Sequence, residues 1–154
     1  MALEVGSVAP SFTLPGGGGR TVSLDKLKGR KVVLYFYPKD DTSGCTKEAQ
    51  EFQALKSEFE KAGAEIVGVS PDGVSSKEKF ATKYGLDLAL AADEDKATLE
   101  AYGVWVEKSM YGRKYMGVER TTFLIGPDGK IAQVWPKVKV PGHAAEVLDA
   151  ARAL

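Results

Sequence analysis

The chain has 154 residues, of which 44% are hydrophobic and 27% are charged, and its 21 basic residues balance its 21 acidic residues. A chain of this length buries roughly two thirds of its unfolded surface on folding, so we expect one domain over residues 1–154. Because the charges balance, no global field attracts a polyanion, which argues against a nucleic-acid partner.

Cysteine content and hydropathy narrow the class of protein further. The single cysteine can form neither an internal disulfide nor a cysteine-based zinc site, so thiol chemistry requires a second sulfur from another molecule. No stretch reaches the ~18 apolar residues that a membrane helix needs, and residues 1–14 lack the pattern of a signal peptide. We therefore expect a cytoplasmic protein without a membrane partner.

The first predicted elements form an N-terminal hairpin. Residues 11–14 and 20–24 have strand character, and the glycine run between them, residues 16–19, is typical of a hairpin loop. A phosphate-binding role for these glycines is disfavoured, because no helix start and no Gly-Lys-Ser or Gly-Lys-Thr follows them.

A strand, a helix and a second strand come next. Residues 32–37 form a continuous β-branched and aromatic run typical of a strand buried on both faces, and residues 65–70 repeat that character. Between them, a helix beginning near Thr46 is predicted, because apolar residues recur at steps of three and four, at Phe52, Leu55, Phe59 and Ala62. The crossover of this unit should be right-handed.

Two further helices are predicted in the middle of the chain. They span residues 76–84 and 94–102, and Asp93 is a suitable N-cap for the second. Residues 88–91 are a candidate short strand between them.

The last third of the chain predicts a hairpin and a helix. Strands at 121–125 and 130–135 flank the turn residues 126–129, and an alanine-rich helix follows over 143–153. Together with the strand–helix–strand unit, this order indicates an α/β protein of the thioredoxin-like plan, with a mixed central sheet flanked by helices. Reactive groups in such sheets gather beyond the carboxyl ends of the parallel strands, where residues 38–45 lie.

Cys45 is predicted at the junction of that loop with the following helix. Unpaired amides and the helix dipole favour negative charge at a helix N-terminus, so this position favours a reactive thiolate. Thr42 could turn its hydroxyl toward the sulfur, and the backbone amides around Gly44 could donate hydrogen bonds to a substrate bound at the sulfur. A lone cysteine is more often a small buried hydrophobe, but the polar loop and the helix start weaken that alternative.

At this point the residues match a known family. The segment Tyr37-Pro38-Lys39-Asp40-Asp41-Thr42-Ser43-Gly44-Cys45-Thr46-Lys47-Glu48-Ala49 resembles the active-site segment of peroxiredoxins, with its Pro-x-x-x-Thr-x-x-Cys spacing. The Ala9-Pro10-x-Phe12 opening and residues 120–125, followed by Asp128-Gly129, resemble the peroxiredoxin Q or bacterioferritin comigratory class. The resemblance covers nearly the whole chain. It implies a thiol-dependent peroxidase that reduces hydrogen peroxide and organic hydroperoxides without a metal or organic cofactor.

The resemblance also implies a role for each residue of the motif. Cys45 becomes the peroxide-attacking nucleophile, Thr42 a hydrogen-bond partner of thiolate and peroxide, and Pro38 a shield against water. Arg120 becomes a permanent cation that favours the thiolate and holds the substrate. Glu48 either orients Arg120 or is an ordinary first-turn glutamate favoured by the helix dipole.

The sequence departs from the family pattern because it has no second cysteine. Gln50 and the cysteine-free residues 79–85 stand where relatives place a resolving cysteine, which implies a one-cysteine cycle. The sulfenic acid on Cys45 must then be reduced by an external thiol such as thioredoxin, glutaredoxin or glutathione. The resemblance favours a monomer, and residues 108–117 resemble the family's loop that borders the site.

Two other functions remain open from the sequence. A cysteine hydrolase would need a base, and the single histidine, His143, is better interpreted as a solvated or capping residue. A non-catalytic thioredoxin-like binding module or redox sensor would carry the same motif. Repeated turnover with a small thiol would favour the enzyme over the sensor.

Overall fold

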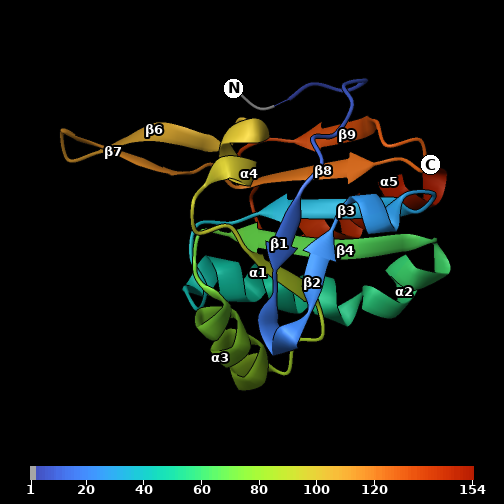
Figure 1. Ribbon diagram of the computed structural model, residues 1–154, viewed down its shortest axis with the longest axis horizontal. Helices are drawn as coiled ribbons and strands as arrows, with labels where there is room; N and C mark the ends of the chain where they lie inside the picture. Colours follow the sequence, from blue (N-terminus) through green and yellow to red (C-terminus); the bar gives the residue numbers. More distant parts are fainter. Residues whose placement is uncertain (1–2) are drawn as a thin grey trace.

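The computed structural model describes residues 3–154, with a five-stranded mixed sheet at the centre (Figure 1). The strands are β3 (Lys31–Phe36), β4 (Ala64–Ser70), β5 (Ala89–Ala92), β8 (Thr121–Ile125) and β9 (Ile131–Trp135), in the order β5-β4-β3-β8-β9. β4 pairs in parallel with β3 and β5, whereas β8 is antiparallel to β3 and β9. The chain therefore has a mixed sheet with β3 as its central strand.

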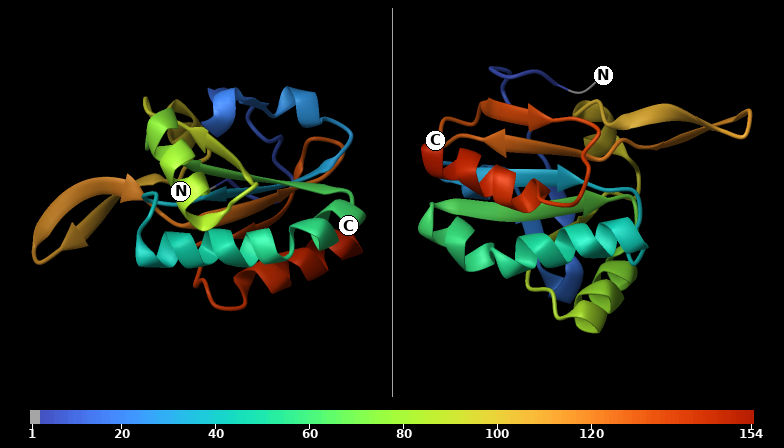
Figure 2. Two further views of the ribbon diagram at one scale, coloured as in Figure 1. Left: turned by 90° about the horizontal axis from the view of Figure 1, so that it is seen from below. Right: turned by 180° about the vertical axis from the view of Figure 1, so that it is seen from behind.

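Helices cover one face of this sheet, and the N-terminal hairpin lies on the other (Figures 1 and 2). The first face carries α1 (Ser43–Ala54), α2 (Lys56–Lys61) and α5 (His143–Ala153). The opposite face carries β1 (Thr13–Pro15), β2 (Thr21–Ser23), the short helices η1 (Gly17–Gly19) and η2 (Asp25–Leu27), and α4 (Ala97–Ala101). α3 (Val74–Tyr84) packs beside β5. This arrangement confirms the predicted α/β fold with its flanking helices and hairpin.

The central strand divides the core into two clusters. Val33 and Tyr35 of β3 belong to the cluster beneath α1, α2 and α5, whereas Val32, Leu34 and Phe36 belong to the cluster on the hairpin side. Because both faces of β3 are covered, each of these side chains is buried, which explains the uninterrupted apolar run in the sequence. No helix within residues 3–154 is long and apolar enough to cross a membrane.

The helix after β3 starts earlier than predicted and is divided in two. Thr42 is extended, with φ −89° and ψ 159°, and acts as N-cap, so α1 begins at Ser43 instead of near Thr46. Leu55 departs from helical geometry, with φ −103° and ψ 5°, and separates α1 from α2. The early start places Cys45 inside the first helical turn, where it has free backbone amides around it.

The predicted N-cap at Asp93 is wrong. α4 begins at Ala97, and its N-cap is Lys96, which has a left-handed backbone with φ 64°. Asp93 is buried, and its Oδ2 accepts a hydrogen bond of 2.8 Å from the backbone amide of Leu99. Its carboxylate therefore satisfies a helix amide from outside the helix, because the chain turns back before α4 starts.

The segment before Arg120 is a β-hairpin, where a loop had been expected over residues 108–117. β6 (Trp105–Met110) and β7 (Arg113–Val118) pair antiparallel and project from the body of the molecule (Figure 1). Tyr111 at its tip is 97% exposed. The hairpin buries little apolar surface, so its strands lack the hydrophobic alternation by which strands are recognised in a sequence.

Candidate active site

Cys45 lies in the first turn of α1, beyond the carboxyl end of β3. The residue is only 2% exposed, and it joins the core cluster beneath α1 that includes Ala49 and Phe52. The first-turn amides of a helix carry partial positive charge and have no partner within the helix. The backbone at this position therefore favours a negatively charged sulfur.

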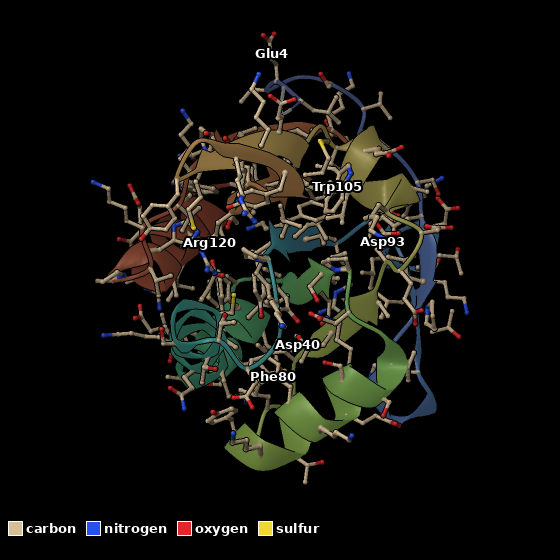
Figure 3. The ribbon with its side chains drawn as sticks, turned by 90° about the vertical axis from the view of Figure 1, so that its left-hand side faces the viewer. Glu4, Asp40, Phe80, Asp93, Trp105 and Arg120 are labelled. Atoms are coloured by element: carbon tan, nitrogen blue, oxygen red, sulfur yellow. The ribbon has the colours of Figure 1, made fainter. Side chains whose placement is uncertain are left out.

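Arg120 reaches Cys45 because β8 runs antiparallel to β3. Thr121, the first residue of β8, stands opposite Phe36, the last residue of β3, so Arg120 lies beside the point where α1 begins (Figure 3). Its Nη2 donates a hydrogen bond of 3.3 Å to the Sγ of Cys45. The amide of Val138 donates to the Arg120 carbonyl at 2.9 Å and fixes its backbone.

Glu48 holds the other side of the same guanidinium. Nη1 of Arg120 donates to Oε1 of Glu48 at 2.6 Å, and the Glu48 side chain is 2% exposed. A carboxylate one helical turn after Cys45 therefore orients the cation toward the sulfur. The sequence left open whether Glu48 orients Arg120 or is an ordinary first-turn glutamate, and this contact favours the first alternative.

Gly44 leaves room for this arrangement. A Cβ atom at position 44 would stand 3.3 Å from Nη2 of Arg120, which is tighter than ordinary van der Waals contact. The glycine next to Cys45 thus allows the guanidinium to lie against the first turn of α1.

Burial and neighbouring charges have opposite effects on the pKa values of Glu48 and Arg120. Burial raises the pKa of Glu48 from 4.5 to about 7, although the charge and hydrogen bonds of Arg120 oppose the rise. Burial acts to lower the pKa of Arg120, but Glu48 and then Cys45 outweigh it and raise that pKa above its ordinary value. Arg120 is therefore a permanent cation beside the sulfur.

Thr42 and Pro38 flank the loop without contacting the sulfur through a hydrogen bond in this structure. The Thr42 hydroxyl donates to the Lys39 carbonyl at 3.0 Å, and the residue is exposed. Pro38 is half-buried just after the end of β3. The hydrogen bond from Thr42 to a thiolate and the shielding by Pro38 stay predictions.

Comparison with known proteins identifies the family. The model of the AhpC/TSA family matches residues 5–134. A Coxiella burnetii protein that carries the peroxiredoxin bcp name is 55% identical over 148 residues, which cover 96% of this chain and 98% of that protein. The chain belongs to the AhpC/TSA family.

Other peroxiredoxins agree with this assignment. Peroxiredoxin Bcp of Bacillus subtilis is 45% identical over 149 residues, covering 97% of this chain and 95% of that protein. A solved structure of Xanthomonas campestris peroxiredoxin Q matches with a TM-score of 0.90 at 46% identity, covering 98% and 96% of the two chains. The chain is thus a peroxiredoxin, a thiol-dependent peroxidase that uses a peroxide substrate and a thiol reductant.

His143 of this peroxiredoxin is a core residue, and its interpretation as a solvated or capping side chain is wrong. It is 5% exposed, and its Nε2 lies 2.8 Å from the Thr122 hydroxyl. Its ring packs edge-on against Phe52 and Trp135. Burial, and secondarily the charge of Arg120, lower its pKa to about 4. The imidazole is therefore engaged with Thr122 and the core, so the structure offers no support for a cysteine hydrolase.

A buried polar cluster beside the site escapes the sequence analysis. Lys77 of α3 is fully buried and forms an ion pair with Asp40. Asp40 belongs to the active-site loop, residues 37–42 between β3 and α1. The signal that could have found it is the spacing of Lys77 with Phe80 and Tyr84, which places a lysine on the apolar stripe of a helix. A lysine at such a position requires a buried acceptor.

The titrations of Glu48 and His143 predict opposite effects of pH on the stability of this peroxiredoxin. Glu48 has a raised folded pKa, so its contribution to stability is present below pH 4.5 and is lost as the pH rises through about 7. His143 has a lowered pKa, so its contribution is present above pH 6.5 and is lost as the pH falls toward about 4. Each contribution amounts to ~3 kcal/mol at most.

Single variants should separate the two effects. The lost contact with Arg120 lowers the stability of Glu48→Gln by a constant amount, but its free energy of unfolding should rise relative to wild type as the pH goes from 5 to above 7. The free energy of unfolding of His143→Gln should rise relative to wild type as the pH falls from 6.5 to 4. Denaturant unfolding across this pH range measures both, with Glu100→Gln at an exposed position as control. Parallel pH profiles for all four proteins would contradict the assignment.

Proposed function

We propose that Cys45 is the residue that reduces the peroxide and that Arg120, Glu48, Thr42 and Pro38 assist it. The observation that carries this proposal is the guanidinium of Arg120, which spans the Sγ of Cys45 at 3.3 Å and the Oε1 of Glu48 at 2.6 Å. A permanent cation held on the sulfur favours the thiolate, and the thiolate is the form of cysteine that attacks peroxides.

In the proposed reaction, the thiolate of Cys45 attacks the terminal oxygen of the hydroperoxide. The sulfur–oxygen bond forms as the oxygen–oxygen bond breaks, so Cys45 is oxidised to sulfenic acid and the peroxide is reduced to an alkoxide or hydroxide. This leaving group takes a proton and departs as alcohol or water. Arg120 and the first-turn amides stabilise the charge that moves from sulfur to the departing oxygen.

The other residues act around this step. Glu48 orients Arg120, so the cation faces the sulfur and the bound peroxide instead of solvent. Thr42 turns its hydroxyl toward the thiolate and the peroxide, and Pro38 limits access of water. Both residues lie in the loop between β3 and α1, which leads to Cys45.

We further infer a one-cysteine cycle completed by an external thiol. One thiol condenses with the sulfenic acid, releases water and forms a mixed disulfide, and a second thiol then restores the Cys45 thiol and leaves as a disulfide. Thioredoxin, glutaredoxin and glutathione each supply such thiols. We propose that the protein works as a monomer in the cytoplasm, where thiols are kept reduced.

Turnover of peroxide with dithiothreitol tests the proposal. Wild-type protein should consume many equivalents of hydrogen peroxide, and protein whose cysteine was first blocked with iodoacetamide should consume none above background. Because Cys45 is the single cysteine, the blocked protein isolates its contribution. Consumption that stops after one equivalent despite excess thiol would favour a redox sensor over an enzyme.

The identity of the reductant is a separate prediction. Because no second cysteine competes for the sulfenic acid, glutathione with glutaredoxin should support turnover through a mixed disulfide on Cys45. Intact mass after one equivalent of peroxide and excess glutathione measures that adduct. Turnover with thioredoxin alone, without any glutathione adduct, would instead assign thioredoxin as the reductant.

A further inference from the structure

A fully buried lysine lies next to the active-site loop. Lys77 of α3 is 0% exposed, and its Nζ donates to Asp40 at 3.0 Å to Oδ1 and 3.2 Å to Oδ2. The same Nζ donates to the Tyr37 hydroxyl at 3.0 Å and to the Ser70 hydroxyl. The side chain of Asp40 is 2% exposed. The ammonium group is therefore completely enclosed and has acceptors for all of its donors.

Asp40 is held from several directions. Its Oδ1 accepts a hydrogen bond of 2.5 Å from Tyr37, its Oδ2 accepts one of 2.8 Å from Ser76, and its amide donates to Asp72 at 2.8 Å. These contacts join the ends of β3 and β4, the start of α3 and the loop that leads to Cys45. In Figure 3, Asp40 lies between α1 and α3.

A buried ion pair of this kind contributes little net stability to a protein core. Desolvation of two charges offsets most of their attraction, and apolar side chains of similar volume often stabilise a fold equally well or better. A buried ion pair does, however, define a single arrangement, because removing either partner leaves an uncompensated charge. Here the arrangement that it defines is the path of residues 37–42 into α1.

We propose that Lys77 and Asp40 are positioning residues, which hold the active-site loop so that Cys45, the first-turn amides and Arg120 align on the peroxide. The inference rests on the proposed role of Cys45. Asp40 lies two residues before Thr42, the N-cap of α1, whose carbonyl accepts a hydrogen bond of 2.8 Å from the amide of Thr46. A shift of Asp40 is thus passed directly to the first turn of the helix.

Two rate constants measured on the same thiol separate positioning from reactivity. Alkylation by iodoacetamide needs an accessible thiolate, whereas peroxide reduction also needs the aligned amides and Arg120. Lys77→Met should lower the rate constant for hydrogen peroxide by at least ~10-fold, since displacements of about 1 Å cost up to ~10²-fold. The alkylation rate should fall by less than ~2-fold or rise, because a loosened loop exposes the sulfur.

The matched control joins the same loop and helix at the surface. Asp41 pairs with Lys83 at 2.9 Å, and their side chains are 41% and 59% exposed. Lys83→Met should leave both rate constants within ~2-fold of wild type, because exposed ion pairs contribute little. A peroxide rate that is unchanged in Lys77→Met, or that falls only in parallel with alkylation, would overturn the positioning role.

A milder variant keeps the test decisive if Lys77→Met does not fold. Ser76→Ala removes one hydrogen bond to Asp40 without changing any charge, and it should lower the peroxide rate by about threefold with alkylation unchanged. Equal peroxide rates for this variant and wild type would then overturn the inference. A different result would contradict the proposed function itself, namely wild-type protein that does not react with peroxide through Cys45.

Discussion

Replacing Arg120 with methionine is expected to lower the second-order rate constant for hydrogen peroxide by ~10²–10³-fold, the usual loss for one donor to a developing negative charge. The guanidinium contacts the Sγ of Cys45 at 3.3 Å, so methionine removes both the cation beside the sulfur and the proposed hydrogen-bond donor for the peroxide. Stopped-flow mixing of reduced protein with peroxide measures the rate constant.

Two further variants test whether the loss of rate is specific to the guanidinium of Arg120. Arg30→Met removes an exposed arginine just before β3, at the opposite end of the sheet, and should leave the rate within ~2-fold of wild type. Arg120→Lys should recover only part of the loss, since an ammonium cannot span Cys45 and Glu48 as the planar guanidinium does. An Arg120→Met protein as fast as the Arg30→Met control would remove Arg120 from the site.

Phe52→Ala is expected to lower the free energy of unfolding by ~3–5 kcal/mol, the range for a large side chain deleted from a core. Phe52 is fully buried and links three elements. Its ring centroid lies 4.7 Å from that of Tyr35 in β3, 5.9 Å from Phe59 in α2 and 6.0 Å from His143 in α5. Because Phe52 packs α1 against Tyr35 of the sheet, the helix that carries Cys45 loses this contact.

Urea unfolding followed by circular dichroism measures this loss. Lys47→Ala, at an exposed position of the same helix, is the control and should change the free energy of unfolding by no more than ~0.5 kcal/mol. A loss below ~1 kcal/mol for Phe52→Ala would show that the core beneath α1 repacks around the cavity, contrary to the close packing of the buried Phe52 ring against Tyr35.

The central part of the fold could be predicted because its strands are buried on both faces. Residues 32–37 form a continuous apolar run and residues 66–69 are an apolar centre within 65–70, and both segments lie inside or directly at the ends of strands of the central sheet. The hairpin at β8 and β9 was predictable from its turn residues, where Gly129 has the positive φ of 81° that glycine adopts readily. Apolar runs and turn residues are patterns of neighbouring residues, so they predict single strands and turns.

The active site depends on contacts that no local pattern reports. Arg120 and Cys45 are separated by 75 positions, and they meet only because β8 pairs with the last residues of β3. Resemblance to a known family placed Arg120 near the site, whereas periodicity alone assigned it no contact. The buried Lys77–Asp40 pair was missed for the same reason, since each residue is charged and its partner lies far away in sequence.

The wrong predictions also have physical causes. Asp93 has the side chain of an N-cap, but the chain makes an extra turn through Lys96 before α4 starts. His143 follows Pro141-Gly142, which indicated an exposed helix start, yet the first turn of α5 packs against Phe52 and Trp135. In both cases tertiary packing determined where a polar side chain was satisfied.

The most direct test of the central claim is a single turnover followed by intact mass. Reduced wild-type protein and Cys45→Ser are each mixed with one equivalent of hydrogen peroxide, and residual peroxide and protein mass are measured together. We predict that the wild-type protein consumes the peroxide and gains one oxygen atom, whereas Cys45→Ser does neither. Peroxide consumption by Cys45→Ser at the wild-type rate, or an unreactive wild-type protein, would contradict the account.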